Sequence, residues 1–474
     1  MTRTTIGLIA RQFCTTAAHG RALYSILLIM ALMLGYAAYS GYKTYTDQNN
    51  IREHYQRVVR ESWEGNPDKH PHRMAHYGSF AFRLKHPLSQ FDFGLESFTG
   101  NAVYLEAHKQ NSVNFSEATF STGLLRFGEI SLALLLQLIL PLFIVFLGFS
   151  AVSADREGGA LKIMLIQGAS WRSILVGKSL GLMALALLVF VPVACVTFVM
   201  LLLADEPATG DTVWRYILLL GGYLLFLQIV CVITVIVSAV SASSKMALMN
   251  LLGIWLLLAV LLPRTLQALG SYVYPSPSKI EFETAVEEDV LKEGDSHNPN
   301  DPHYSALKDS VLRVHHVDSI QKLPFNYSGF VMREGERISA NIYDRHLKKL
   351  LSVYKQQNSL NRVMAFVNPY VAIRNISMAL SGTDFESYVA FQHGAEAYRY
   401  QMAQTMNELQ MEYISTQQTS ISHDHWKELP EYRQEPVSVT SVLKNEVWSF
   451  IALLAWGMVA VVLIQRISKT AKAL

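Results

Sequence analysis

Charged residues are scarce in this chain of 474 residues. They occupy 16% of positions, whereas hydrophobic residues occupy 51%, and this composition excludes an ordinary soluble protein. The net charge is only +2, and basic residues form no cluster interleaved with aromatics, which excludes nucleic acid as a partner. The chain is too long to be one membrane domain alone, so it must combine membrane and aqueous parts.

Cysteine is rare as well, because the chain has only Cys14, Cys195 and Cys231. This number and spacing exclude a disulfide framework in the polar regions and a cysteine-based zinc motif. The run 177–179 reads Gly-Lys-Ser like the end of a phosphate-binding loop, but Arg172 occupies the earlier glycine position and no strand precedes it. Hydrolase motifs are missing too. We therefore expect no enzymatic activity and no cofactor in this chain.

Six stretches without charge predict six membrane-spanning helices in contact with lipid. They cover residues 22–42, 130–153, 179–204, 216–244, 246–263 and 447–465. The first could be a secretory signal, since small residues follow at 35–40, but its length favours an uncleaved span. Residues 1–42 thus form the N-terminus and first span, residues 130–263 form spans two to five, and residues 447–474 form the last span and a tail.

Two polar regions, 43–129 and 264–446, separate these groups of spans. Ile51, Tyr55 and Val58 have helical spacing and predict that the first span continues as a helix. In the second region we expect a helix over 334–367 and another with an apolar seam over 388–409, which begins with Thr383 and Glu386 in capping-box spacing. Because the first region has few apolar positions, we expect both regions to form one helical domain.

The distribution of cations predicts the topology. Segment 155–178 carries Arg156, Lys162, Arg172 and Lys178 against two anions, and short loops rich in Lys and Arg stay in the cytoplasm. An acidic turn with Asp205, Glu206 and Asp211 lies on the other side. Both chain ends are then cytoplasmic, and both polar regions lie outside. The predicted fold class is an all-α membrane protein with six spans and a large, mainly helical extracytoplasmic domain built from two insertions.

Within segment 155–178, Glu157 is expected to begin a short helix with Leu161, Met164 and Leu165 on one face. Such a helix either docks on a partner or lies on the membrane surface. The runs 157–161 (EGGAL), 163–168 (IMLIQG) and 177–181 (GKSLG) resemble the cytosolic coupling segment of type-2 ABC exporter permeases. Ala160 and Gly168 depart from the threonine and the nearby proline that are common there.

That resemblance implies docking on a separate ATP-binding subunit, which would bind the ATP and Mg²⁺. The implied contact residues are Arg156, Glu157, Gly158, Leu161, Met164, Leu165 and Arg172. The blocks 71–78, 91–95, 105–108, 368–369, 374–384 and 395–399 resemble a bacterial subgroup of these permeases with a large, uncharacterised extracytoplasmic region. This second resemblance implies the bacterial inner membrane, with the large domain in the periplasm.

Histidines in the first polar region are candidate metal ligands. His70, His72 and His76 lie close together, as the ligands of a copper or zinc site would. Pro71 and Gly78 favour the alternative of a turn with local hydrogen bonds. We therefore assign no metal site, and these three residues remain candidates only.

Three functions fit the sequence. The first is a permease subunit of an ATP-driven exporter, paired with a second copy or a related permease. The second is a mechanical transmitter that uses ATP hydrolysis by its partner to rearrange a periplasmic or outer-membrane protein without moving cargo. The third is a passive membrane anchor, which would need no docking helix. The charge-free spans argue against an ion-coupled carrier.

Overall fold

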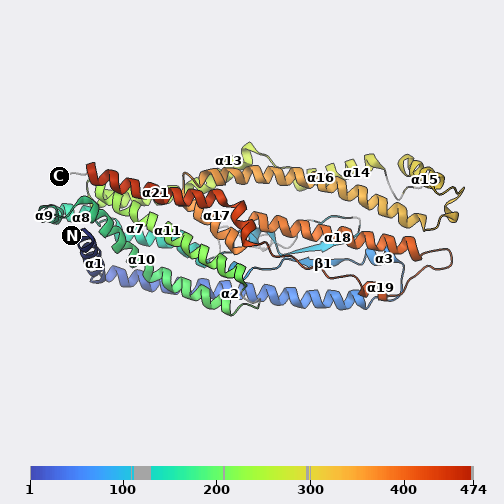
Figure 1. Ribbon diagram of the computed structural model, residues 1–474, viewed down its shortest axis with the longest axis horizontal. Helices are drawn as coiled ribbons and strands as arrows, with labels where there is room; N and C mark the ends of the chain where they lie inside the picture. Colours follow the sequence, from blue (N-terminus) through green and yellow to red (C-terminus); the bar gives the residue numbers. More distant parts are fainter. Residues whose placement is uncertain are drawn as a thin grey trace.

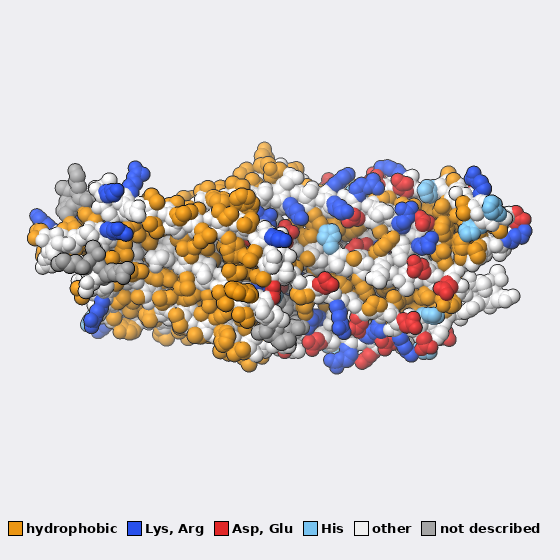
Figure 2. Space-filling model, in the orientation of Figure 1, with side chains coloured by type: hydrophobic (Ala, Val, Ile, Leu, Met, Phe, Trp, Pro, Cys, Tyr) orange, Lys and Arg blue, Asp and Glu red, His pale blue; other side chains and the backbone are white. Residues whose placement is uncertain are grey.

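The computed structural model describes residues 2–107, 109–111, 130–205, 209–294, 298 and 300–470. The molecule is elongated, and its long helices run along its longest axis (Figure 1). Hydrophobic side chains dominate the surface of one half, which we call the apolar half, and charged side chains of both signs cover the other, the polar half (Figure 2). This division matches the mixture of membrane and aqueous parts that the composition predicts.

Six helices are long and apolar enough to cross a membrane, as expected for an all-α, multi-pass membrane protein. Three of them are uninterrupted within the span, namely α10 (Trp171–Leu202), α11 (Gly210–Val240) and α21 (Val447–Thr470). Another, α2 (Arg21–Glu64), continues far beyond the membrane length, as the spacing of Ile51, Tyr55 and Val58 predicts. The remaining two consist of shorter consecutive pieces: α6 (Leu132–Leu134), η3 (Leu135–Ile139), α7 (Leu140–Gly148) and α8 (Ser153–Glu157), then α12 (Ser244–Leu256), η4 (Leu257–Leu261) and α13 (Leu262–Val273).

Several helices extend beyond the charge-free stretches that predict the spans, and two of them change the role of named residues. The third span begins at Trp171, so Arg172 and Lys178 belong to the helix and not to the preceding loop. The fifth span does not end at Pro263 but continues to Val273. Proline usually breaks a helix because it lacks an N–H group and clashes with the preceding turn. Here the π-helical turn η4 immediately before Pro263 accommodates it.

The same device occurs at Pro141, which follows the π-helical turn η3. Side chains from neighbouring elements satisfy backbone carbonyls within both turns. The Trp255 indole N–H donates to the carbonyl of Leu138 at 3.1 Å, and the Asn368 amide donates to the carbonyl of Leu258 at 2.6 Å. Apolar surroundings offer no water for such groups, so these bonds allow the spans to bend without an unsatisfied carbonyl.

A helix that the sequence analysis did not predict, α1 (Thr2–Ala18), lies along α10. Close packing depends on Gly177 and Gly181 of α10. A Cβ atom at Gly177 would come within 2.8 Å of the Ile9 Cβ, and one at Gly181 within 3.1 Å of the Phe13 ring. The glycines of the Gly177–Gly181 run therefore serve helix packing.

The polar half is mainly helical. Its described elements are α3 (Pro71–Ala75), β1 (Ser79–Phe82), η1 (Pro87–Gln90), α4 (Glu96–Thr99), β2 (Ala102–Leu105), α14 (Lys279–Glu293), α15 (Pro302–Val314), η5 (Ile320–Lys322), α16 (Tyr327–Met364), α17 (Pro369–Ser381), α18 (Phe385–Tyr413), α19 (Asp424–Lys427) and α20 (Val439–Asn445). Strands β1 and β2 pair antiparallel, with Ser79 opposite Leu105, so a small sheet accompanies the helices of this half. Helix α17 packs against α11 and α21 where the two halves meet.

The two polar regions pack against each other. Trp63 at the end of α2 shares a buried cluster with Met402 and Trp426 of the second region, and its indole N–H donates to the Trp426 carbonyl at 2.9 Å. Residues 108 and 112–129 of the first region lie outside the described residues, as do Glu206 and Pro207 of the expected acidic turn. Asp211 does not belong to the expected loop between spans, because it is already part of helix α11, in its first helical turn.

The predicted seam of α18 faces the interior, with Phe391, Ala395 and Met402 buried. The residue that caps this helix is Asp384 and not Thr383, since the Asp384 carboxylate accepts a hydrogen bond from the Ser387 amide at 3.2 Å. The apolar positions Ile51 and Tyr55 of α2 are exposed. Helical spacing correctly indicates the helix there but does not say which face is covered.

Candidate functional site

The segment from α8 to α9 (Ala160–Ile166) forms one extreme end of the molecule, near both chain ends (Figure 1). Gly158 and Gly159 join the two short helices, and Gly159 has a φ of 77°, a left-handed conformation that favours glycine. Glu157 is the last residue of α8, so the prediction that it begins the next helix is wrong. The backbone of Gly159 occupies the N-cap position of α9 instead.

Three consecutive charged residues of α8 bind three different membrane helices. The first, Asp155, forms an ion pair with Lys178 of α10 at 2.7 Å. The Lys178 side chain is buried and also lies over the Phe13 ring of α1, 5.4 Å from its centroid. Because an unpaired ammonium group would be costly at this buried position, Asp155 fixes α8 to α10.

The second, Arg156, binds the C-terminal end of α11. Its guanidinium donates to the Ser241 carbonyl at 2.7 Å and to the Ala239 carbonyl. The last carbonyls of a helix have no partner within the helix and carry partial negative charge, so a cation is stabilising there.

The third, Glu157, binds the N-terminal end of α12. Its carboxylate accepts hydrogen bonds from the Ser244 amide and the Ser244 hydroxyl, both at 2.8 Å. The first amides of a helix lack internal partners and attract an anion. Arg156 and Glu157 therefore bind the two ends of the turn between α11 and α12, one at the end of α11 and the other at the start of α12.

Helix α9 presents a different face from the predicted one. Leu161 is only 1% exposed, and Met164 and Leu165 pack against the hydrophobic core of the apolar half. The exposed apolar side chains are Ile163 and Ile166, which are 58% and 77% exposed. Leu161 thus anchors α9 to its own bundle, so it is not accessible for docking as expected. The exposed apolar face belongs instead to two isoleucines that were not among the predicted contact residues. Their i, i+3 spacing was a signal for a second face.

The exposed charge at this end is mainly positive. Lys162 and Arg172 are exposed. Glu157 is exposed too, but its carboxylate binds Ser244, and Asp155 pairs with Lys178. In the view of Figure 2 the end that carries α8 and α9 shows Lys and Arg side chains and no Asp or Glu. The combination of two exposed isoleucines with flanking cations suits a protein surface with an apolar patch and acidic residues around it.

Other candidate residues from the sequence have structural roles. Lys178 of the Gly177–Ser179 run lies inside α10 and pairs with Asp155, so this run forms no phosphate-binding loop. His70 caps α3 by accepting a hydrogen bond from the His72 amide at 3.2 Å. The ring nitrogens of His72 and His76 lie 3.2 Å apart. Within the described residues, no group of three or more His, Cys, Asp and Glu side chains is arranged to hold a metal.

Comparison with known families gives one match. Residues 279–435 match the family described as a domain of unknown function, DUF3526. This range begins at α14 and includes α15 to α19, so it lies mainly within the polar half. The chain matches no curated protein.

Proposed function

We propose that this chain is the membrane-spanning permease subunit of an ATP-driven exporter, coupled through α8 and α9 to a separate ATP-binding subunit. The observation that supports it most is the arrangement of Asp155, Arg156 and Glu157, which bind α10, α11 and α12. A force on α9 would reach three spans at once through these contacts. The resemblance of segments 157–168 and 177–181 to coupling segments of type-2 ABC permeases agrees with this role.

In this proposal the end with α8 and α9 lies in the cytoplasm. Its exposed cations agree with the positive-inside rule, and both chain ends lie near it (Figure 1). The polar half then lies outside the membrane, in the periplasm of a bacterium whose inner membrane holds the chain. The partner subunit binds ATP and Mg²⁺, and this chain contributes no catalytic residue.

A second permease copy, or a related permease, completes the proposed assembly. The helix formed by α12, η4 and α13 has only 11% of its most apolar window buried, against 61% for α11. Leu256, Leu257 and Leu261 are exposed on it. A two-fold assembly would cover such a face. Membrane lipid covers the apolar faces that remain.

Copurification with the ATP-binding subunit tests the docking. The double variant Ile163→Asp, Ile166→Asp places two charges on exposed positions of α9 and leaves the buried Leu161 anchor intact. We expect loss of the ATP-binding subunit from the purified complex. The matched control is Ile280→Asp, because Ile280 is 76% exposed on α14 in the polar half. Full copurification of the double variant would contradict the proposed docking.

The mechanical transmitter is a second candidate, and the length of α2 favours it. This helix runs without a break through 44 residues from the apolar half to Trp63 in the core of the polar half. Movement of the first span would therefore reach the polar half directly. ATP-dependent cargo movement in sealed vesicles that contain only the two subunits would exclude this candidate and support an exporter.

A further inference from the structure

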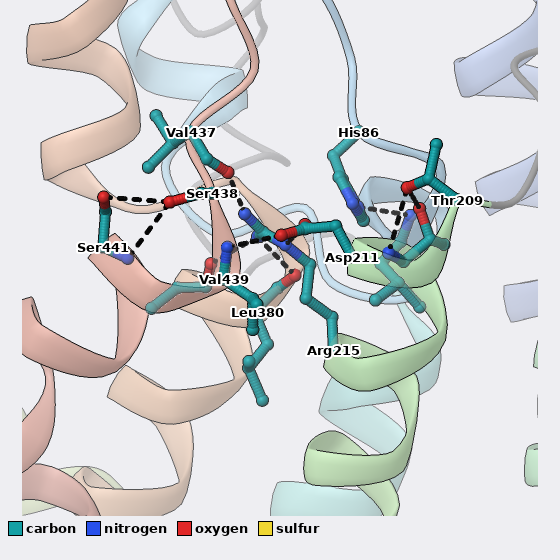
Figure 3. A network of polar contacts seen from close by, with 12 residues as sticks. His86, Thr209, Asp211, Arg215, Leu380, Val437, Ser438, Val439 and Ser441 are labelled. Atoms are coloured by element: carbon teal, nitrogen blue, oxygen red, sulfur yellow. Dashed lines mark hydrogen bonds and ion pairs between the residues drawn. The ribbon is translucent and has the colours of Figure 1, made fainter.

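A cavity of about 330 Å³ lies where the polar half meets the apolar half. Its walls come from four places: the start of α11, the segment before η1, the junction of α17 and α18, and the segment that leads to α20. Figure 3 shows residues from several of these segments. The start of α11 is also the end of a helix long and apolar enough to span a membrane, so in a bilayer the cavity would lie near the level where lipid headgroups meet water. The proposed coupling residues lie at the opposite end of α11.

Arg215 builds one wall of this cavity and is itself 1% exposed. Its guanidinium donates to Asp211 at 2.6 Å, to the Leu380 carbonyl at 3.0 Å and to the Val437 carbonyl. The Asp211 carboxylate also accepts from the Val439 amide at 2.6 Å. These bonds, shown in Figure 3, join three segments and make the wall rigid.

The opposite wall carries two more buried cations, Arg83 and Lys85, which are 3% and 4% exposed. Lys85 pairs with Glu96 at 2.6 Å. Arg83 donates to the Gly382 carbonyl at 2.8 Å and to the Thr99 hydroxyl. The Arg83 guanidinium makes no direct ion pair among the described residues, and the carboxyl of this chain that interacts with it electrostatically is the buried Asp384. A buried guanidinium without a direct ion pair favours an anion placed in contact with it.

His86 adds a neutral donor to the same wall. Burial lowers the pKa of His86 to about 3, so the ring is uncharged at neutral pH. Its Nδ1 atom accepts a hydrogen bond from the Leu88 amide at 3.1 Å, so the proton of the neutral ring is on Nε2. One guanidinium without a direct ion pair, beside polar donors, fits one phosphate or carboxylate group.

The remaining wall is apolar and includes Leu84, Pro87, Pro436 and Val437. A small inorganic anion would not use these residues. A molecule with an anionic group joined to an apolar chain would use both parts of the cavity, because burial of each methylene adds to binding.

We propose that this cavity binds an anionic amphiphile, with its phosphate or carboxylate against Arg83 and the beginning of its apolar chain against Leu84, Pro436 and Val437. The site does not depend on the proposed exporter function, because it rests on the cavity, its charge and its position at the end of a span.

Thermal unfolding of the detergent-purified full chain, followed by tryptophan fluorescence, measures binding. Three probes are titrated: dihexanoylphosphatidylglycerol, which is anionic, dihexanoylphosphatidylcholine, which is zwitterionic, and inorganic phosphate. We expect a saturable rise of the unfolding midpoint with the anionic lipid at concentrations at least tenfold lower than with the other two, in line with one charge-assisted contact.

Two variants test the position of the site. Arg83→Gln removes the charge and retains a donor for the Gly382 carbonyl, and it should weaken binding of the anionic lipid about tenfold. Pro436→Trp adds bulk at an exposed position of the rim and should block binding without a change in the core. Arg337→Gln, on the exposed surface of α16, is the control and should bind normally.

Three results would overturn the proposal. They are equal binding of the zwitterionic and the anionic lipid, binding of inorganic phosphate as tight as that of the anionic lipid, and unchanged lipid binding by Pro436→Trp. If Arg83→Gln does not fold, Pro436→Trp still decides the question, because Pro436 is exposed and its substitution should spare the fold.

Discussion

The Glu157 carboxylate accepts two hydrogen bonds from one residue, the amide and the hydroxyl of Ser244, each at 2.8 Å. Ser244 is the first residue of α12, so the last residue of α8 accepts hydrogen bonds at the N-terminal end of another span. A substitution at this contact can therefore distinguish two properties: attachment of the partner subunit, and transmission of its movement to the spans.

Glu157→Gln should impair transmission and spare attachment. The amide side chain retains one acceptor for Ser244 but loses the negative charge that suits the start of α12. We expect normal copurification of the ATP-binding subunit and a lower stimulation of its ATPase by this chain. Glu283→Gln, on the exposed surface of α14, should have no effect. Loss of copurification in Glu157→Gln would show that this residue contacts the partner instead.

His86 should make the chain sensitive to acid. The pKa of His86 is lowered by burial to about 3, so the unfolded state, with a normal histidine, binds a proton at higher pH than the folded state. Stability is therefore complete above about pH 6.5 and falls as the pH drops towards 3. Between pH 6.5 and 5 this residue should cost about 2 kcal/mol.

His86→Asn retains an acceptor that can cap η1 and should reduce the loss of stability between pH 6.5 and 5. Equilibrium unfolding at a series of pH values measures the difference. His54→Asn, at an exposed position of α2, serves as the control and should follow the original chain. The same pH dependence in His86→Asn and the original chain would assign the acid sensitivity to other groups.

Arg399 should be essential for the polar half. Its guanidinium is fully buried between Glu336 at 2.6 Å and Glu396 at 2.9 Å, which joins α16 to α18. Arg399→Met leaves two carboxylates without a cation and should cost about 3 to 5 kcal/mol. Arg337→Met, on the exposed face of α16, should cost less than about 0.5 kcal/mol.

The pH dependence of Arg399→Met identifies the cause of its loss. Burial raises the pKa of Glu396, and without Arg399 this effect has no opposing cation. A carboxyl group whose pKa is raised on folding stabilises the protein at low pH, and this contribution is lost as the pH rises through the folded pKa. The variant should therefore unfold at a higher temperature at pH 5 than at pH 8. An equal loss at both pH values would point to packing alone.

A disulfide should form between the two polar regions. Lys69 and Ile421 are partners in an antiparallel bridge, with the Ile421 amide donating to the Lys69 carbonyl at 3.2 Å. Such partners have Cα atoms about 5 Å apart, within reach of a disulfide. We expect Lys69→Cys, Ile421→Cys to crosslink within one chain, as judged by mobility on non-reducing gels. Ile51→Cys, Ile421→Cys should not crosslink, because Ile51 lies about three helical turns before Trp63, the residue of α2 that packs in the cluster with Ile421.

The native cysteines do not interfere with this test, since Cys14, Cys195 and Cys231 belong to helices of the apolar half. Crosslinks only between two chains would contradict the arrangement of both polar regions in one domain.

The number of spans could be predicted because a run without charge is a property of consecutive residues. The end of the fifth span could not, since Pro263 breaks most helices and is tolerated here by a π-helical turn and by Asn368 from a distant segment. Helix α1 escaped prediction for a similar reason. Its packing depends on Gly177 and Gly181, far away in the sequence.

At the candidate coupling site, the sequence correctly indicated a short amphipathic helix. It did not indicate which face of this helix packs against the bundle and which face is exposed. The spacing of Leu161, Met164 and Leu165 predicts one apolar face, and it contains no information on which surface covers that face. Glu157 was expected near a helix start, and it is at one, but at the start of α12 and not of the helix that follows it. Contacts between segments about 90 residues apart produce no periodic pattern in the sequence from which they could be predicted.

The uninterrupted course of α2 has a mechanical consequence. At 1.5 Å per residue, its 44 residues make a rod about 66 Å long. A tilt of about 5° at the membrane end of such a rod displaces its far end by about 6 Å, which is more than the rise of one helical turn. Trp63 fastens that far end to the domain of α18. If the first span moves as the transmitter hypothesis proposes, this rod would amplify the motion by leverage, and a small rotation of one span would shift the tip of the molecule by the width of a side chain.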